Sequence, residues 1–273
     1  GSYLAELLLE QGYEVWGILR RHSLPENQSS RLSKIFNNPL LHLVYGDVTD
    51  FASLLTLINN CQPHEIYNLA AQSHVKISFN QPVFTTHADA VGVLNLLEVV
   101  RVASPDTRIY QAGSSEMFGN ECDKDGFRRE TTLMRPVSPY GCAKLYAYNV
   151  ARVYRSSYDM FISNGILFNH ESPRRGINFV TNKIVDGAVK IKKGLQKTLA
   201  LGNLEATRDW GHAKDYVRAM WLMLQHDTPD DFVCATGKSH SVRELCDLVF
   251  SLLNLDYREY VTISPEYYRP TEL

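Results

Sequence analysis

The segment Ser138-Pro-Tyr-Gly-Cys-Ala-Lys144 organises this 273-residue chain. Its serine suits a helix N-cap and its proline the first helical position, so we predict a helix from residue 139 to about Tyr158. Side chains four residues apart share a helix face, so Tyr140 and Lys144 lie one above the other. A lysine ammonium beside a phenol lowers the tyrosine pKa, which makes Tyr140 a candidate proton shuttle. Two ordinary surface residues would show the same spacing, so only the rest of the chain can indicate whether Tyr140 and Lys144 form a functional pair.

The composition is typical of a globular protein in water, with 44% hydrophobic and 21% charged residues. A net charge of −2 provides no basic field, so we expect no nucleic-acid partner. We also expect no membrane partner, because the apolar stretches look shorter than a membrane span and no basic secretory leader is present. The five cysteines are scattered without a C-x-x-C pair, which predicts reduced thiols and a cytoplasmic location.

The first twenty or so residues resemble a dinucleotide-binding unit that is entered partway. Residues 1–11 are predicted to form a helix ending before Gly12, and residues 13–19 a buried strand. In such a unit Gly1 is the last glycine of the phosphate-binding turn, and the helix N-terminus faces the pyrophosphate. The pair Arg20-Arg21 after the strand suits the 2′-phosphate of NADP, where an acidic residue would favour NAD. A solvated loop is the alternative interpretation of the two arginines.

Strands alternate with helices along the chain, which predicts an α/β fold with a doubly wound parallel sheet. Further strands are expected at residues 40–45, 65–69, 107–111 and 160–168. Polar or small residues follow the first three of them: Asp47, Ala70 to Ser73, and Ser114 to Glu116. Because ligands bind outside the carboxyl ends of parallel strands, we expect these turns to converge on one crevice.

The second half of the chain is less regular. A long amphipathic helix at residues 82–103, with Val91, Leu94, Val99 and Val102 on its buried side, precedes it. We predict a Rossmann-like NADP-binding domain over residues 1–168 that lacks its first strand. Residues 169–273 are predicted to form mainly a smaller substrate-binding lobe, interleaved with the first domain. Four arginines on predicted loops are candidates for clamping phosphates, with plain surface arginines as the alternative: Arg174, Arg175, Arg208 and Arg269.

Several long strings resemble the GDP-mannose 4,6-dehydratases, which belong to the extended short-chain dehydrogenases with their Ser/Thr-Tyr-Lys set. The resemblance covers essentially the whole chain. Its strings are Gln111-Ala-Gly-Ser-Ser-Glu-Met-Phe-Gly119, Ile166-Leu-Phe-Asn-His-Glu-Ser-Pro-Arg-Arg-Gly176, Leu201-Gly-Asn-Leu-Glu-Ala-Thr-Arg-Asp-Trp-Gly211, Tyr67-Asn-Leu-Ala-Ala-Gln-Ser-His-Val75 and Tyr268-Arg-Pro-Thr-Glu272.

The resemblance implies NADP that is bound tightly and recycled in each turnover, with GDP-mannose as the substrate. It implies that Tyr140 removes the C4 hydroxyl proton while hydride leaves for NADP⁺, that Lys144 holds the ribose, and that Ser114 bonds the C4 oxygen. Glu116 would take the C5 proton and help to expel the C6 hydroxyl as water. Hydride return to C6 would then yield GDP-4-keto-6-deoxymannose, the first step towards GDP-fucose and related deoxysugars.

The reaction chemistry supports Glu116 independently. Elimination needs a base beside the oxidation machinery, and a carboxylate two residues after Ser114 can enter the same crevice. A helix-start acid or a solvated loop carboxylate is the alternative interpretation. His170 has no partner histidine or cysteine at ligand spacing, so we predict no metal site.

The resemblance also implies binding residues and an assembly. Phe84 stands where family members often have a tyrosine near the cofactor, which puts one hydrogen bond in doubt. The likeness implies a homodimer or homotetramer, with the arginine loop at the subunit contact. The implied cofactor contacts are Gly1, Arg20, Arg21, Ser23, Asp47, Val48, Leu69, Ala70, Ala71, Ser73, Phe84, Tyr140, Lys144, His170 and Arg175. The implied substrate contacts are Asn169, Val180, Lys183, Arg208, Arg269 and Glu272.

Three alternatives remain open from the sequence. A nucleotide-sugar 4-epimerase would use Ser114, Tyr140 and Lys144 but would not need Glu116. A dehydratase for another nucleotide sugar would use all four, and an NADP-sensing protein would need none of them for catalysis. Because members of the family begin before Gly1 and continue past Leu273, we also expect the chain as given to bind NADP poorly.

Overall fold

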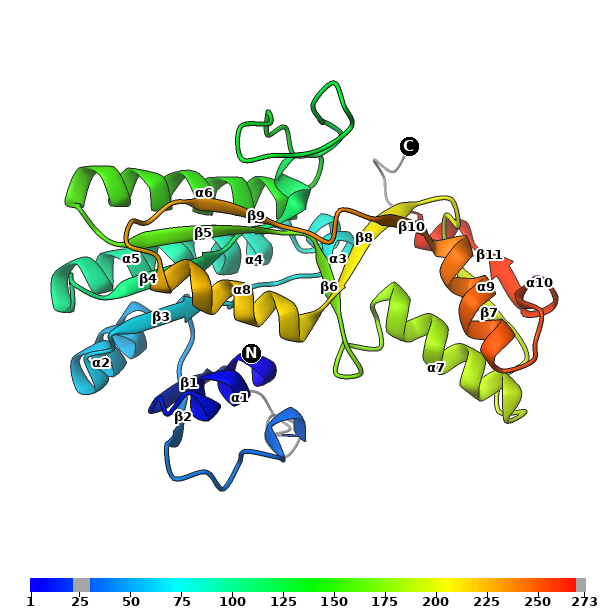
Figure 1. The fold of residues 1–273 in the computed structure, drawn as a ribbon, viewed down its shortest axis with the longest axis horizontal. Helices are drawn as coiled ribbons and strands as arrows, with labels where there is room; N and C mark the ends of the chain where they lie inside the picture. The colour runs from blue at the N-terminus through cyan, green and yellow to red at the C-terminus, as the bar shows by residue number, and fades with distance from the viewer. Residues whose placement is uncertain (22–29, 269–273) are drawn as a thin grey trace. The chain divides into compact units, whose positions relative to one another are not determined.

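A computed structural model describes residues 1–21 and 30–268 of the chain (Figure 1). Contacts between residues divide the chain into two compact units. Unit 1 consists of Gly1–Leu167 and Ala213–Cys234, and unit 2 consists of Phe168–His212 and Ala235–Leu273. The chain therefore leaves unit 1 close to the predicted boundary and returns to it for one helix and one strand.

Unit 1 alternates strands and helices, as the sequence predicts. Its strands are β1 Val15–Leu19, β2 Leu41–Tyr45, β3 Glu65–Asn68, β4 Arg108–Ala112, β5 Ile162–Leu167 and β9 Asp231–Cys234. Its longer helices are α1 Ser2–Glu10, α2 Phe51–Cys61, α5 Gly92–Ala103, α6 Pro139–Tyr158 and α8 Ala213–Gln225. Its shorter helical segments are α3 Val75–Asn80, α4 Pro82–Thr86, the π-helical turn η3 His87–Val91, and the 3-10 turns η2 Ser30–Leu32 and η4 Ser115–Met117.

All strand pairs in unit 1 are parallel, which confirms the predicted α/β class. The strands form two sheets rather than the single sheet expected, with the orders β1-β2 and β3-β4-β5-β9. The division arises because no strand in the described part of the chain forms hydrogen bonds with both β1 and β3.

The larger sheet of unit 1 is buried on both faces. Side chains alternate across a strand, so neighbouring residues of β4 enter different cores. Ile109 packs with α2, α5 and α6, whereas Tyr110 packs with α1 and α8. Both side chains are completely buried. This two-sided covering is the doubly wound arrangement predicted from the sequence.

The segment Pro82–Ala103 corrects two expectations. It is long and apolar enough to cross a membrane, so the expectation that every apolar stretch is too short was wrong; 56% of its apolar window is buried inside the protein. The predicted buried face was also wrong in part, because Val91 and Val102 are exposed while Val93, Leu97 and Val100 fill the core. The π-helical turn η3 changes the rotation of side chains partway along the segment.

The described part of unit 2 is built from short strands, two longer helices and two short helical segments. Its strands are β6 Asn169–Glu171, β7 Leu199–Leu201, β8 Thr207–His212, β10 Ser239–Ser241 and β11 Val261–Ile263. Its helices are α7 Val180–Lys192, α9 Val242–Leu252, α10 Tyr257–Tyr260 and the 3-10 turn η5 Pro265–Tyr267. The strands form the sheets β10-β8-β6 and β11-β7. Side chains of α7 and α9 share one core with β7.

Candidate active site

The start of α6 places Tyr140 and Lys144 as predicted. The Ser138 hydroxyl oxygen accepts a hydrogen bond from the Gly141 N–H at 3.0 Å, which makes it the N-cap, and Pro139 occupies the first turn. Both functional side chains are buried, with 8% of Tyr140 and 3% of Lys144 exposed. The helix therefore holds a phenol and an ammonium inside unit 1 rather than on its surface.

Lys144 reaches from α6 to the carboxyl end of β4. Its Nζ donates a hydrogen bond to the Ala112 carbonyl oxygen at 3.1 Å and lies 5.8 Å from the centre of the Tyr140 ring. Burial lowers the pKa of Lys144, and the negative charge of Asp89 opposes that change. The ammonium thus contacts the backbone two residues before Ser114, at the strand end where the sequence predicts the crevice.

Ser114 and Glu116 are held together against α6. The Ser114 hydroxyl oxygen caps the 3-10 turn η4 by accepting from the Glu116 N–H at 3.2 Å. Gly141 lies so close to this turn that an added Cβ would be 2.7 Å from the Glu116 carbonyl oxygen. Glycine is therefore required at the third residue of the α6 helix, and the turn carrying Glu116 lies against the start of α6. The four predicted catalytic residues come from two adjacent segments of unit 1.

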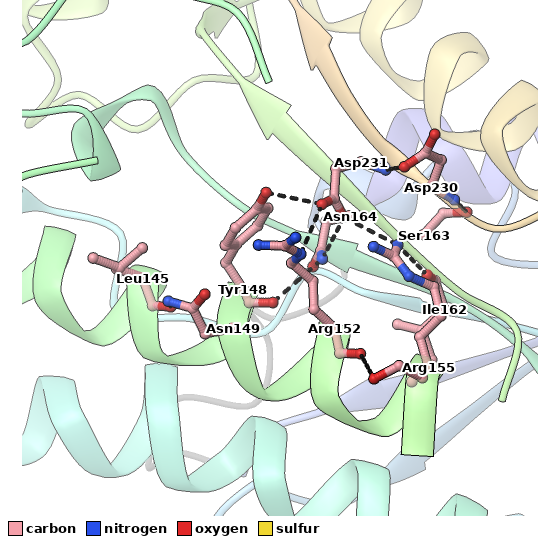
Figure 2. A network of polar contacts seen from close by, with 11 residues as sticks. Leu145, Tyr148, Asn149, Arg152, Arg155, Ile162, Ser163, Asn164, Asp230 and Asp231 are labelled. Carbon is pink, nitrogen blue, oxygen red and sulfur yellow. Dashed lines mark hydrogen bonds and ion pairs between the residues drawn. The ribbon is translucent and has the colours of Figure 1, made fainter. Parts of the chain in front are cut away.

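The far half of α6 is fixed to the sheet by one carboxylate. Figure 2 shows Asp231, on β9, at the centre of a polar network between α6 and β5. Its oxygens accept hydrogen bonds from the Tyr148 hydroxyl at 2.8 Å, the Asn164 amide at 2.9 Å and the Arg155 guanidinium at 3.0 Å. Arg152 adds an ion pair at 3.3 Å. This network joins the helix that carries Tyr140 to β5 and β9 of the sheet.

The turns after β2 and β3 are braced by neighbouring side chains. Val48 lies beside Gly92, where an added Cβ would meet its methyl group at 2.7 Å, and its carbonyl oxygen accepts from the Asn95 amide at 3.1 Å. Asp47 accepts from the Thr49 N–H and hydroxyl. The α2 helix is capped instead by Asp50, which leaves the predicted adenine contact of Asp47 as a prediction.

The turn after β3, from Leu69 to Ser73, follows a buried pair of side-chain amides. Asn68 donates to the Gln111 side chain at 2.8 Å, and its own oxygen accepts from the Ala70 N–H at 3.2 Å. The turn backbone is thus held at its start by these amides, and Ala70, Ala71 and Ser73 in the turn have small side chains. Such a backbone can approach a ligand closely, as predicted for a dinucleotide.

Two arginines follow β1, and each lies against an aromatic ring. The Arg20 guanidinium lies 5.9 Å from the Phe84 ring centre, and Arg21 lies 5.2 Å from that of Tyr45. Phe84 therefore contacts Arg20 through its ring, where a tyrosine would add a hydroxyl. The predicted contact Ser23 lies outside the described residues.

The N-terminus of α1 fits an anionic group. Helix α1 has no side-chain cap at Gly1 and no acidic residue in its first turn. A Cβ added at Gly1 would meet nothing within 4 Å, so there is open space at this end of the helix. A helix N-terminus of this kind favours negative charge such as phosphate.

Unit 2 holds His170 and Arg175 in a polar cluster of its own. The His170 Nδ1 lies 2.9 Å from the Phe168 carbonyl oxygen, and burial lowers the pKa of the ring. Arg175 forms an ion pair with Glu171 at 3.2 Å, and its guanidinium lies 3.6 Å from the centre of the Phe179 ring. At neutral pH this arrangement favours an uncharged His170 beside a charged Arg175.

The predicted substrate residues of unit 2 lie on strands and on a helix. Asn169 and His170 belong to β6. Arg208 belongs to β8, so the expectation that this arginine lies on a connecting loop was wrong. The two segments pair in parallel with each other, which converts the predicted loops into a small sheet. Val180 begins α7, and Lys183 places its Nζ 3.3 Å from the centre of the Tyr267 ring. Arg269 and Glu272 lie outside the described residues.

One residue near the site was missed at the sequence level. Asp89, in the π-helical turn η3, is completely buried and acts electrostatically on Lys144. A signal was present, because an acidic residue inside the apolar run from Ala88 to Val93 is unusual for a buried helix face. Its partner was not visible, since Lys144 lies 55 positions further along the chain.

Comparison with solved structures agrees with this fold. The dTDP-glucose 4,6-dehydratase DesIV from Streptomyces venezuelae, solved with NAD and TYD bound, matches with a TM-score of 0.85 at 24% identity, over 98% of this chain and 82% of that one. The UDP-glucose 4-epimerase of Thermus thermophilus, in complex with NAD, gives 0.84 at 25%, over 100% and 85%. RMD from Pseudomonas aeruginosa, complexed with NADPH, gives 0.78 at 21%, over 92% and 87%.

Comparison with characterised sequences is more specific. The family model described as GDP-mannose 4,6 dehydratase matches residues 1–273. The GDP-mannose 4,6 dehydratase of Homo sapiens is 48% identical over 298 aligned residues, covering 100% of this chain and 79% of that protein. GDP-mannose 4,6 dehydratase 2 of Caenorhabditis elegans is also 48% identical, covering 100% and 77%. Because the family model matches the whole chain and these relatives are 48% identical to it, the chain belongs to the GDP-mannose 4,6-dehydratase family.

Proposed function

We propose that this protein is a hydro-lyase that converts GDP-mannose into GDP-4-keto-6-deoxymannose with a recycled NADP cofactor. The observation that supports the proposal is the contact of the start of α6 with the end of β4, in a chain of this family. Lys144 bonds the Ala112 carbonyl oxygen there, and Gly141, next to Tyr140, lies against the turn that carries Glu116. A dehydratase needs an oxidation site and an elimination base side by side. The contact between Gly141 and the turn of Glu116 supplies that proximity.

Each of the four residues has its own role in the proposed dehydration. The Tyr140 phenolate takes the proton of the C4 hydroxyl, and the charged Lys144 favours that phenolate. The Ser114 hydroxyl donates to the C4 oxygen as negative charge develops on it. A nicotinamide cofactor held by unit 1 would supply the hydride chemistry that the oxidation at C4 and the reduction at C6 require. Glu116 removes the C5 proton, which the C4 ketone makes acidic, and delivers a proton to the departing C6 hydroxyl.

The choice of NADP over NAD rests on the pair Arg20-Arg21. Similar solved structures carry NAD in some cases and NADPH in others, so they support a nicotinamide dinucleotide in general. The two arginines follow β1 directly, at the place where an acidic residue would favour NAD. Each guanidinium group lies beside an aromatic ring. A 2′-phosphate offers them an anionic partner, whereas the 2′-hydroxyl of NAD does not.

We assign dinucleotide binding to unit 1 and the nucleotide-sugar contacts mainly to unit 2. In unit 2 the charged Lys183 and Arg208 are suited to the diphosphate of GDP-mannose. A cytoplasmic homodimer or homotetramer completes the proposal. Size-exclusion chromatography with light scattering tests the assembly, and a monomer at micromolar concentration would contradict it.

The reaction is tested by following the mass of the nucleotide sugar. Purified protein is incubated with GDP-mannose and a catalytic amount of NADP⁺, and the products are analysed by mass spectrometry. We expect the loss of one water per molecule without net formation of NADPH. An unchanged mass with altered stereochemistry at C4 would favour an epimerase, and dTDP-glucose and UDP-glucose as substrates test for another nucleotide-sugar dehydratase.

Glu116→Gln separates the dehydratase from an epimerase at one residue. The amide keeps the shape of the side chain but cannot take up the C5 proton, so we expect dehydration to be lost while C4 oxidation continues. Oxidation is measured in a single turnover as NADPH absorbance at 340 nm. Continued release of water by this variant would contradict the role of Glu116.

A further inference from the structure

Asp89 is a buried carboxylate to which the proposed chemistry assigns no task. It lies in the π-helical turn η3 and is completely buried, between the buried Ala88 and Ala90. In the described part of the chain no cation lies within 4 Å of it as an ion pair. A buried aspartate without such a partner destabilises the fold and therefore calls for an explanation.

The two oxygens of Asp89 are in different environments. Its Oδ1 accepts a short hydrogen bond of 2.6 Å from the Gln72 N–H, whereas its Oδ2 has no hydrogen-bond partner within the described residues. Gln72 is itself immobilised, because its side-chain amide bonds the backbone of His74 and the Thr85 hydroxyl. The carboxylate is thereby fixed to the turn after β3 that is proposed to line the cofactor.

The turn η3, which carries Asp89, packs against α6, which carries Lys144. Both side chains are buried there, and they act on each other electrostatically. Burial raises the pKa of Asp89 to about 6, and the Lys144 charge opposes that rise. Burial lowers the pKa of Lys144, and Asp89 is the charged group that opposes the change. Each is thus a charged side chain that opposes the effect of burial on the other. The two opposite charges are therefore each other's main electrostatic partner inside unit 1.

We propose that Asp89 is a positioning residue for the reaction, a buried counter-charge that keeps Lys144 protonated and ties it electrostatically to the cofactor-lining turn through Gln72. The assignment rests on the proposed function only for its consequence in catalysis. Among the described residues Lys144 has one hydrogen bond, to a neutral carbonyl. A buried ammonium without a counter-charge tends to lose its proton. A neutral lysine would no longer favour the Tyr140 phenolate.

The test substitutes Asp89→Asn, which keeps an oxygen to accept from the Gln72 N–H and removes the charge. The titration of Lys144 is followed in cofactor-free protein labelled with ¹³C-lysine, through the Cε resonance that Lys144→Arg identifies by its disappearance. We expect the midpoint for Lys144 to fall by at least one pH unit in Asp89→Asn. An unchanged midpoint would overturn the proposal, because a carboxylate that only braces Gln72 would leave the lysine unaffected.

The matched control is Asp159→Asn, at the opposite end of α6. Asp159 is exposed and adopts a left-handed conformation with φ of 55°, which asparagine tolerates well. The variant removes one negative charge at the C-terminal end of the helix that carries Lys144, without touching the site. We expect the Lys144 midpoint to match that of the wild type, and an equal fall in both variants would contradict a specific role for Asp89.

Enzyme kinetics adds a second readout. In Asp89→Asn we expect the alkaline limb of the kcat/KM profile to move to lower pH, following the lysine, with at least a tenfold loss at pH 8.5 and a smaller loss at pH 7. A uniform loss at every pH would contradict the charge role. If the wild type shows no dehydration at all, the proposed function fails, whereas the lysine titration still decides the role of Asp89.

Discussion

The burial of Asp89 predicts an unusual result for stability: removing its charge strengthens the fold. The pKa of this carboxyl rises from 3.8 to about 6 on folding, with burial as the main cause. Because one pKa unit corresponds to about 1.4 kcal/mol, the ionised form lowers the free energy of unfolding by about 3 kcal/mol at high pH. The sign follows from the raised pKa: stability is fully present below pH 3.8 and is lost as the pH rises through 6.

Asp89→Asn should therefore be more stable than the wild type above pH 6. Of the total, about 2 kcal/mol develops between pH 4.5 and pH 8, since the unfolded aspartate is already largely ionised at the lower value. For a chain of this size, the Tm advantage of Asp89→Asn over the wild type should therefore be about 4–8 °C larger at pH 8 than at pH 4.5. Urea titrations followed by tryptophan fluorescence at both pH values measure it directly.

The control and the refuting result are well defined. Asp159→Asn, which removes an exposed charge, should not reproduce the gain in stability at pH 8. If Asp89→Asn were less stable than the wild type at pH 8, or if its advantage were the same at both pH values, the carboxylate would not be a destabilising buried charge. If Asp89→Asn were more stable than the wild type and also lowered the titration midpoint of Lys144, Asp89 would be a residue that supports function at the expense of stability.

Three further substitutions probe the scaffold of the site. Ser138→Ala removes the N-cap of α6 and should lower the free energy of unfolding by about 1 kcal/mol, measured by urea titration. Asp231→Ala leaves a partly buried guanidinium and two other donors without their shared acceptor and should lower it by about 3 kcal/mol or more, measured in the same way. Gly119→Ala introduces a Cβ only 2.0 Å from the Arg135 carbonyl oxygen and should reduce both thermal stability and dehydration, because Glu116 lies three residues upstream.

Each of these has an outcome that counts against it. A wild-type Tm in Ser138→Ala would mean that other contacts secure the start of α6, and a loss below 1 kcal/mol in Asp231→Ala would mean that the network of Figure 2 is not coupled. Gly126→Ala is the matched control for Gly119→Ala, since it also has positive φ but open space around its Cβ position. Equal effects of the two glycine substitutions would rule out the steric explanation.

Local signals in the sequence were sufficient for the parts of the site that lie close together in the chain. The serine and proline before Tyr140 predicted the start of α6, and the structure has Ser138 as its N-cap. The alternation of strands and helices predicted the doubly wound α/β class, and the long family strings predicted the membership that the comparisons show. These features depend on interactions between residues a few positions apart, which the order of amino acids specifies directly.

Tertiary packing decided the features that depend on distant segments. The sequence pattern assigned Val91 and Val102 to a buried face, yet both are exposed, because a π-helical turn resets the rotation of the helix. Two interactions join residues far apart in the chain: the hydrogen bonds of Asp231 to α6, and the electrostatic effect of Asp89 on Lys144. Burial and electric field are properties of the neighbourhood that folding creates, so the amino-acid order determined which groups are present, and the packed structure alone decided which charges act on one another.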